Sequence, residues 1–243
     1  MIYKQEIDTP SYLCDVDDHL HTWAAVRLCQ EVTEYHGNAT GIGFQTLLAQ
    51  NRAWVITHAY YNIYRMPDAF ERIVLTTWSR GNNGLIANRD YRIATPQGED
   101  LLTGTSCWPM IDMTTRRVLR LNELIANYEN HPECATQYDK LPKLVLPDMT
   151  GAGVAMSRTA SYAMLDHTQH VNNSEYIRMI FDFMHESGFR TSEPFSLDVS
   201  YAHESRLGDE LQLTYAQVGG DHYIKIDNPR GNSIAAKIAT IGN

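Results

Sequence analysis

One order of sequence patterns occurs twice in this chain of 243 residues, and this repeat constrains its fold more than any other feature. Each copy opens with a Ser-Tyr pair and an Asp-x-x-x-His spacing, continues with an amphipathic stretch of helical period, and ends in several strand-like runs bounded by turn residues. The two openings are Ser11-Tyr12 with Asp17 and His21, and Ser161-Tyr162 with Asp166 and His170. A helix followed by an antiparallel meander, present twice, predicts an α+β fold.

The apolar spacing and the turn residues set the expected limits of each element. We expect helices over residues 22–36 and 173–186, with Gly37 and Gly188 as their C-terminal stops. The expected strands cover residues 53–64, 73–79, 87–94 and 102–113 in the first half, and residues 195–203, 210–217, 222–226 and 233–241 in the second. Residues 38–48 occur only in the first half, where a mobile cover over an apolar tunnel and a packed connection are both open.

The chain is expected to divide into two repeats and a linker. Residues 128–152 contain three prolines and Gly151, a composition typical of linkers. We therefore expect an N-terminal repeat over residues 1–127 and a C-terminal repeat over residues 153–243. Each repeat alone is short for a stable core and would expose a sheet edge, so we expect the two sheets to join edge to edge.

Composition and charge narrow the class of protein. A net charge of −9 argues against nonspecific nucleic-acid binding, which needs Lys and Arg to neutralise phosphates. No apolar run reaches membrane-spanning length, and the first residues lack a signal or transit pattern, so we expect a cytoplasmic protein without membrane insertion. The four cysteines are scattered, and the Asp and His residues of 15–21 lack a recognised ligand spacing. We therefore expect reduced thiols and no metal site.

Residues 165–173, with the sequence LDHTQHVNN, bring acid and base groups to the start of the second expected helix. Asp166 and His170 are four residues apart, and Asn172 or Asn173 is a favoured N-cap. The backbone N–H groups and partial positive charge at a helix start suit a developing oxyanion. The pattern is typical of a site that hydrolyses an acyl compound, and a purely capping role for Asp166 and His170 fits the same residues.

Four segments together resemble one enzyme family. They are residues 165–177 (LDHTQHVNNSEYI), 51–57 (NRAWVIT), 77–81 (TWSRG) and 88–91 (NRDY). The chain is similar, nearly end to end, to the acyl-acyl carrier protein (acyl-ACP) thioesterases with a tandem hot dog fold. The resemblance implies a double hot dog, in which each repeat wraps an antiparallel sheet around a long helix. It also implies an enzyme of fatty acid biosynthesis that hydrolyses fatty acyl-ACP to free fatty acid and carrier thiol.

The same resemblance assigns candidate catalytic residues in the loop before the second helix. Asp166 and His170 match the family's Asp and His. The family's intervening Asn falls on Thr168, whose hydroxyl can also form hydrogen bonds, with shorter reach and different donors. Asn172 and Asn173 are expected at the helix start, near the carbonyl oxygen of the substrate.

The strand after the second helix supplies the remaining candidates. Glu204 matches the family's glutamate and Ser205 replaces its cysteine, which rules out a thiolate there, and the chain has no Gly-x-Ser-x-Gly elbow. Carboxylate chemistry remains. Asp166 is expected to act on the thioester carbonyl, as nucleophile or as base for water, while Glu204 orients or deprotonates the water and His170 positions both. We expect Ser205 and His167 beside these groups.

The implied partner is an acyl carrier protein; no cofactor is expected, and a homodimer is left open. Carrier proteins are acidic, as this chain is, so docking needs a local basic patch. The candidates for this patch are Arg116, Arg117, Arg120, Lys140, Lys143, Arg178 and Arg206. Two other functions stay open: an acyl-coenzyme A thioesterase, in which the patch meets nucleotide phosphates, and a noncatalytic acyl-binding protein with the same fold.

Overall fold

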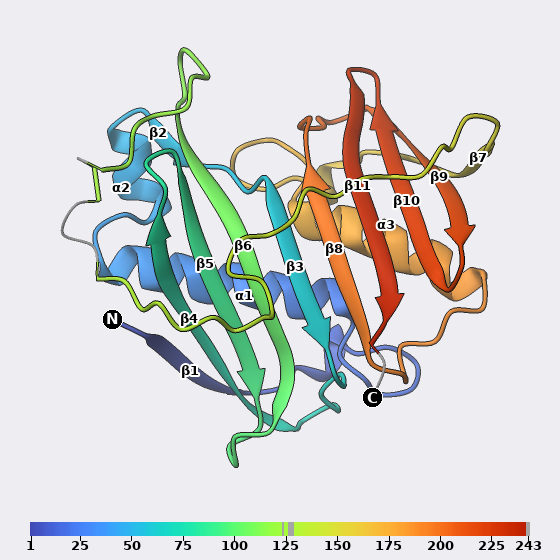
Figure 1. Cartoon of the computed structure of the whole chain (residues 1–243), viewed down its shortest axis with the longest axis horizontal. Coiled ribbons are helices and arrows are strands. Elements are labelled where there is room, and N and C mark those ends of the chain that lie inside the picture. The colour runs from blue at the N-terminus through green and yellow to red at the C-terminus, as the bar shows by residue number, and fades with distance from the viewer. Residues whose placement is uncertain (123, 126–128, 242–243) are drawn as a thin grey trace.

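The computed structural model describes residues 1–122, 124–125 and 129–241, in which one antiparallel sheet of eleven strands curves around two long helices (Figure 1). The first half contributes β1 (Tyr3–Asp8), η1 (Ser11–Leu13), α1 (Thr22–Ala39), α2 (Phe44–Ala49), β2 (Arg52–Trp54), β3 (His58–Ile63), β4 (Arg72–Asn82), β5 (Ile86–Ala94) and β6 (Asp100–Asp112). The second half contributes β7 (Val154–Thr159), η2 (Tyr162–Met164), α3 (Asn173–Glu186), β8 (Phe195–Tyr201), β9 (Glu210–Val218), β10 (Asp221–Asn228) and β11 (Gly231–Thr240). The expected α+β class is confirmed.

The two half-sheets join through β3 and β8, so the strand order is β1-β4-β5-β6-β3-β8-β11-β10-β9-β7, with β2 paired to β6. The junction is antiparallel and runs from His58 opposite Ser200 to Ile63 opposite Phe195. Leu197, in the middle of the junction, is fully buried. This pairing satisfies backbone groups that each half would otherwise expose at a sheet edge.

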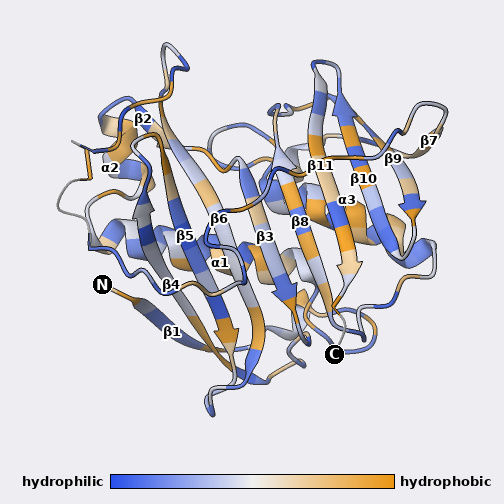
Figure 2. Ribbon diagram, viewed as in Figure 1, coloured by the Kyte–Doolittle hydropathy of each residue, from blue (hydrophilic) through white to orange (hydrophobic). Residues whose placement is uncertain are grey.

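The helices α1 and α3 contact each other and lie on one face of the sheet (Figure 1). Ala24 and Ala25 are fully buried in α1, and their small side chains permit a close approach to the strands. Ile177 and Ile180 are fully buried in α3 and belong to the same core. Apolar residues, orange in Figure 2, therefore form one core shared by both helices and both half-sheets.

The loops before α1 and α3 repeat each other, but not in the expected alignment. In the first half the Asp15 N–H donates to the His19 carbonyl at 2.8 Å, and in the second half the Asp166 N–H donates to the His170 carbonyl at 2.9 Å. The expected alignment, which started at Asp17, is therefore wrong by two residues. Two overlapping Asp-x-x-x-His spacings occur in the first half, and only the fold shows which one matches.

The helix α3 has the expected limits, whereas α1 continues past its expected stop to Ala39. Gly188 follows α3 with a φ of 87°, the left-handed conformation that glycine adopts after a helix. Gly37 instead lies inside α1, where a Cβ atom would stand 3.1 Å from the Cα of Gly43. Gly37 thus permits the close approach of the segment that leads into α2, and its assignment as a stop is wrong.

The expected strands are present with small shifts, and the largest difference has a local cause. Residues 53–64 form two strands, because the register with β6 shifts between them. Trp54 lies opposite Met110 and His58 lies opposite Cys107, so three residues separate Trp54 from His58 where only two separate Cys107 from Met110. The extra residue is a β-bulge between β2 and β3. The sequence pattern does not predict β1 and β7. These edge strands contain no fully buried residue, and each places few apolar side chains against the core, namely Tyr3 and Ile7 in β1 and Met156 in β7, which is a weak strand signal.

Residues 129–152 cross the outer face of the sheet, on the side away from the helices (Figure 1). The Trp78 Nε1–H donates to the Glu133 carbonyl at 2.9 Å, and the Ala135 N–H donates to the Asp90 Oδ2 at 2.6 Å. Specific hydrogen bonds therefore hold the expected linker. Its expected start, between residues 127 and 128, lies outside the described residues, and the domain limits stay a prediction.

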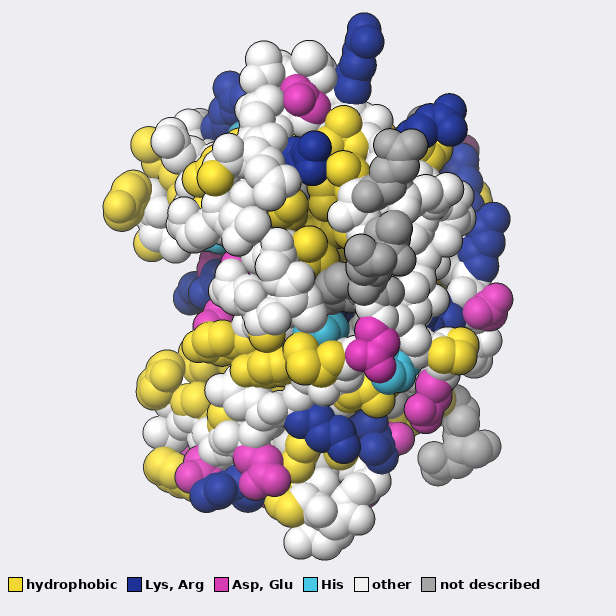
Figure 3. All heavy atoms as spheres, turned by 90° about the vertical axis from the view of Figure 1, so that its left-hand side faces the viewer, with side chains coloured by type: hydrophobic (Ala, Val, Ile, Leu, Met, Phe, Trp, Pro, Cys, Tyr) yellow, Lys and Arg dark blue, Asp and Glu magenta, His cyan; other side chains and the backbone are white. Residues whose placement is uncertain are grey.

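The surface is of mixed charge. On the end of the molecule that carries α2, Lys and Arg side chains lie mainly in the upper half and Asp and Glu side chains mainly in the lower half (Figure 3). None of the helices in the described ranges combines the length and the apolar character that a membrane crossing requires.

His36, near the end of α1, provides a test of the packing of the first half. The side chain is fully buried, and the Arg89 Nη1 lies 2.9 Å from its Nδ1. Burial and the neighbouring Arg89 guanidinium lower the pKa of His36 from 6.5 to about 4. The folded protein therefore holds this ring neutral at pH values at which the unfolded chain takes up a proton.

We expect the free energy of unfolding to fall as the pH falls from about 6.5 to about 4, because proton uptake at His36 favours the unfolded chain in that window. At about 1.4 kcal/mol per pKa unit, the loss reaches about 3 kcal/mol. His36→Asn keeps an acceptor for Arg89 but does not titrate, so this part of the pH dependence should vanish. Urea unfolding of both proteins between pH 4 and 7 measures it, and identical pH dependence would contradict the assignment.

Candidate active site

A cavity of about 510 Å³ lies between α1, the segment that contains α2 and the loop that precedes α3. Its apolar walls come mainly from the first half and include Ile42, Phe44, Leu47, Trp54, Trp108 and Ile111. Its polar part comes mainly from the second half and includes Asp166, Thr168, His170, Asn172, Asn173 and Glu204. An apolar compartment therefore adjoins acid, base and amide groups, an arrangement that suits a ligand with an apolar chain and a reactive polar end.

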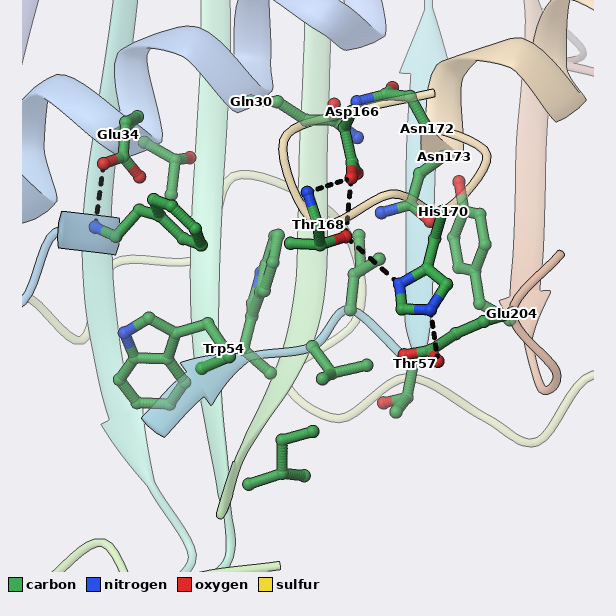
Figure 4. Close-up of a pocket in the computed structure, with 18 of the residues that line it drawn as sticks. Gln30, Glu34, Trp54, Thr57, Asp166, Thr168, His170, Asn172, Asn173 and Glu204 are labelled. Carbon is green, nitrogen blue, oxygen red and sulfur yellow. Dashed lines mark hydrogen bonds and ion pairs between the residues drawn. The ribbon is translucent and has the colours of Figure 1, made fainter. Parts of the chain in front are cut away.

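The segment between α1 and β2 forms a packed wall of this cavity. The Phe44 N–H donates to the Glu34 Oε1 at 2.8 Å (Figure 4), and Leu47 is buried in a small second core. The centroids of the Phe44 and His167 rings are 3.8 Å apart. His167 thus lies against this wall and lines the cavity, which places it beside the candidate catalytic groups as expected.

The loop between η2 and α3 holds three of the candidate residues in one chain of hydrogen bonds (Figure 4). The Thr168 N–H and hydroxyl donate to the Asp166 Oδ1 at 2.8 and 2.5 Å, and the Thr168 Oγ1 lies 3.1 Å from the His170 Nδ1. A hydroxyl has one hydrogen, so donating it to Asp166 leaves only lone pairs for His170. With that hydrogen on Asp166, the Nδ1–H tautomer of His170 completes the chain, and Thr168 connects the carboxylate to the imidazole.

Glu204 completes the cluster from the segment that follows β8. Its Oε2 lies 3.3 Å from the His170 Nε2, and its Oε1 pairs with the guanidinium of Arg116. The Glu204 carbonyl accepts hydrogen bonds from the Asn228 Nδ2 at 3.0 Å and the Arg230 Nη2 at 3.1 Å. These bonds fix the backbone, and the carboxylate faces the imidazole (Figure 4).

The start of α3 supplies a backbone donor beside this cluster. Asn172 is the N-cap, and its Oδ1 accepts from the Ser174 N–H at 2.9 Å while its carbonyl accepts from the Glu175 N–H at 2.9 Å. Asn173, the first residue of the helix, lines the cavity, and its N–H has no partner among the described residues. This N–H and the positive end of the helix provide a candidate oxyanion site.

Ser205 does not face the cavity. The residue is fully buried, and its hydroxyl contacts the Asn228 Nδ2 at 2.9 Å and the Ser233 hydroxyl at 3.3 Å. Its carbonyl accepts the Val171 N–H at 2.8 Å, which ties the end of β8 to the candidate catalytic loop. Ser205 therefore lies next to Glu204 and holds the candidate loop, and it is not among the residues that line the cavity.

Two of the cations expected in a docking patch are engaged elsewhere. Arg116 pairs with Glu204, a contact that the sequence analysis missed because the two residues are 88 positions apart. Arg178 lies 5.3 Å from the centre of the Trp23 ring and 3.9 Å from the Glu175 carboxylate. The only sequence signal for the role of Arg116 is its place in an arginine-rich turn, which does not point to a partner.

The first half carries the same loop without the same chemistry. The His19 Nδ1 contacts the Asp68 Oδ1 at 2.8 Å, and neither residue lines the cavity. Pro67 accepts the backbone bond from Leu20 that Ser205 accepts in the second half, so buried Met66 stands where Glu204 stands. The candidate glutamate therefore has no counterpart in the first repeat.

Two further observations bear on the chemistry of the cavity. Burial raises the pKa of Tyr176 and of Tyr201, which line the cavity, so both hydroxyls stay neutral at physiological pH. Within the described ranges, no group of three or more His, Cys, Asp or Glu side chains is arranged to hold a metal ion.

Sequence comparisons place both halves of the chain in one family. Residues 1–128 match the family model of the acyl-ACP thioesterase N-terminal domain, and residues 155–240 match that of the C-terminal domain. The chain is 27% identical over 228 residues to the acyl-[acyl-carrier-protein] hydrolase FATB3, chloroplastic, of Cuphea viscosissima, with 88% of this chain and 54% of that protein covered. It is 24% identical over 249 residues to the dodecanoyl-[acyl-carrier-protein] hydrolase, chloroplastic, of Umbellularia californica, with 93% and 64% covered. The chain spans about half the length of the first of these relatives.

Solved structures show the same architecture. An acyl-ACP thioesterase from Bacteroides thetaiotaomicron matches with a TM-score of 0.86 at 20% identity, covering 99% of this chain and 98% of that one. The 12:0-ACP thioesterase from Umbellularia californica matches with a TM-score of 0.86 at 20% identity, covering 100% and 98%. These likenesses confirm the expected double hot dog fold. Since the two family models together account for most of its length, the chain belongs to the acyl-ACP thioesterase family.

Proposed function

We propose that this protein hydrolyses the thioester of a fatty acyl-ACP and releases free fatty acid and the carrier thiol, as a step of fatty acid biosynthesis. The family and the names of the relatives support this activity. One observation carries it: Asp166, Thr168, His170 and Glu204 form a continuous chain of contacts at the polar side of an apolar cavity. The reaction needs no cofactor. A cytoplasmic location and a homodimer stay predictions from the sequence.

The proposed reaction uses water activated by the carboxylate and imidazole groups. Glu204, paired with His170, accepts a proton from water, and the water oxygen attacks the thioester carbonyl. The negative charge that develops on the carbonyl oxygen is stabilised by the Asn173 N–H at the start of α3. The carbon–sulfur bond then breaks, the carboxylic acid forms, and the thiolate takes up the proton from the Glu204 and His170 pair.

Asp166 has two possible roles, and the contacts leave the same oxygen available for both. Its Oδ1 is held by Thr168, whereas its Oδ2 has no partner in the described part of the chain. The Oδ2 atom can attack the thioester carbonyl, so that the carbon–sulfur bond breaks, the thiolate leaves and an acyl anhydride forms, which water then hydrolyses to the fatty acid and free Asp166. Alternatively, Oδ2 can accept a proton from the attacking water. Both routes use the same carboxylate and require no cysteine.

The loss of either carboxylate tests this chemistry. We expect Asp166→Asn and Glu204→Gln each to lower kcat by about 100-fold to 10,000-fold, the usual effect of removing a positioned general base, with little change in acyl-chain binding. Steady-state hydrolysis of a purified acyl-ACP measures kcat, and fluorescence titration with a fatty acid measures binding. Retention of full turnover in both variants would contradict the assignment of the site.

Substitution of Ser205 distinguishes a mechanism that uses carboxylates from one that uses a serine nucleophile. Because its hydroxyl is buried away from the cavity, we expect Ser205→Ala to keep turnover within about threefold of the wild-type value, whereas loss of a true nucleophile costs several orders of magnitude. The same change removes the buried contacts of the Ser205 hydroxyl with Asn228 and Ser233 and should lower the free energy of unfolding by about 2 kcal/mol. Kinetics and urea unfolding of the same preparation provide both values, and a kcat loss above 100-fold would contradict the proposal.

A second hollow, of about 260 Å³, adjoins Glu204 and supports the proposed carrier substrate. Arg116, Arg206 and Arg230 line it together with His203. Arg206 is exposed, and no ion pair of its guanidinium occurs among the described residues. Arg116 pairs with Glu204, which also lines the hollow, and Arg230 pairs with Asp209. Arg206 is therefore the cation that this hollow offers to an acidic carrier with a phosphate-linked arm, against the repulsion expected from the net charge of −9.

Charge reversal at Arg206 tests the carrier. We expect Arg206→Glu to raise the KM for an acyl-ACP about tenfold and to leave the KM for a small acyl thioester unchanged, because only the carrier presents acidic side chains. Lys4→Glu, on edge strand β1, makes the same charge change elsewhere on the surface and serves as the control. Equal changes in KM for both substrates, or equal effects of both variants, would argue against a carrier site here.

Turnover of acyl-ACP compared with acyl-coenzyme A distinguishes the proposed carrier thioesterase from the two other functions that the sequence leaves open. Preferential turnover of acyl-ACP supports the proposal, preference for acyl-coenzyme A favours the coenzyme A thioesterase, and acyl binding without turnover favours the noncatalytic binding protein.

A further inference from the structure

Arg116 connects the first repeat to the candidate catalytic glutamate of the second. The two oxygens of the Glu204 carboxylate have separate partners: Oε1 pairs with the Arg116 guanidinium, and Oε2 faces the His170 Nε2 at 3.3 Å. The Arg116 side chain is 49% exposed and that of Glu204 is 34% exposed. Ion pairs this exposed contribute little to stability, so stability alone does not account for the contact.

The backbone at Arg116 is unusual for a residue with a side chain. Its φ is 59°, in the left-handed region that favours glycine. The turn that holds it is fixed by several bonds: the Arg116 N–H donates to the Asp112 carbonyl at 2.8 Å, and the Asp112 Oδ1 accepts from the Thr115 N–H at 2.7 Å and the Thr114 N–H at 3.1 Å. These bonds hold Arg116 in a conformation that costs about 1 kcal/mol or more, as is frequent at functional sites.

The two carboxylates of the site indicate the effect of the Arg116 guanidinium. Asp166 and Glu204 line the same cavity, and two carboxylates close to one imidazole repel each other. The Arg116 guanidinium on the outer side of Glu204 offsets this repulsion, so the carboxylate can stay beside His170, where it can accept a proton from water. The ion pair also restricts the rotamers of a side chain whose other oxygen must stay close to His170.

We propose that Arg116 is a positioning residue, which holds the Glu204 carboxylate facing His170. The first repeat then supplies part of the catalytic arrangement of the second, in addition to the walls of the cavity. This inference rests on the proposed thioester hydrolysis, because it assigns Arg116 a role in that reaction. It differs from the docking role expected from the sequence, since a docking cation acts through the carrier and a positioning cation acts through Glu204.

The test uses the full chain and a small acyl thioester, acyl-N-acetylcysteamine, so that carrier docking plays no part. We expect Arg116→Ala to lower kcat about 10-fold to 100-fold, with KM changed less than threefold, because a misplaced catalytic group lowers the rate of chemistry rather than binding. Arg116→Lys should recover part of kcat, because it restores a cation beside the Glu204 Oε1.

The control is Arg92→Ala, which removes another Arg–carboxylate pair, with Asp100, whose partners are each 40% exposed and which lies outside the cavity. We expect it to leave kcat and KM unchanged. A wild-type kcat in Arg116→Ala would overturn the inference. So would a lower kcat with no recovery in Arg116→Lys, because that result indicates a structural role only. Absence of thioester hydrolysis by the wild-type protein would instead contradict the proposed function itself.

Discussion

Six backbone pairs join β3 to β8, from His58 opposite Ser200 to Ile63 opposite Phe195, and the candidate site depends on this junction. The His58 Nε2 also contacts the Asp198 Oδ1 across it at 2.6 Å, and the Tyr201 N–H donates to the Thr57 carbonyl at 2.9 Å. Because β8 leads directly to the candidate glutamate, these bonds fix the position of that glutamate relative to the first half. The junction thus places the chemistry of one repeat beside the cavity walls of the other.

The two repeats share a fold, but the second supplies the polar candidate residues and the first supplies most of the apolar cavity wall. Both form the same hydrogen-bonded loop before their long helix, yet the first has Met66 where the second has Glu204 and has His21 as the N-cap where the second has Asn172. The first repeat instead carries α2, which adds Leu47 to the cavity wall and has no counterpart in the second. Divergence of this kind lets one chain keep a single reactive cluster and use the other half for an apolar chain.

The sequence predicts the features that depend on local pattern. The limits of α3 follow from its apolar spacing and its asparagine N-cap, and the residues of the loop before it are adjacent in the chain, so their proximity needs no long-range information. Contacts between distant residues are different. Nothing in the order of residues indicates that Arg116 meets Glu204, because this contact depends on the turn after β6 and on the β3–β8 junction. The alignment of the first loop fails for another reason, since two equivalent spacings overlap there and only hydrogen bonding distinguishes them.

The threonine at position 168 changes which groups of the site can donate a hydrogen bond to a substrate. The carboxamide expected there from the family resemblance has two donor hydrogens and an acceptor oxygen, so it can bind an aspartate and still donate a second bond. Thr168 has one hydroxyl hydrogen and directs it to the Asp166 Oδ1, while its oxygen faces the His170 Nδ1. No donor of this side chain is left for a substrate oxyanion. Under the proposed reaction, the Asn173 N–H at the start of α3 remains as a donor for that oxyanion, and a helix end offers it without a side-chain rotamer to order.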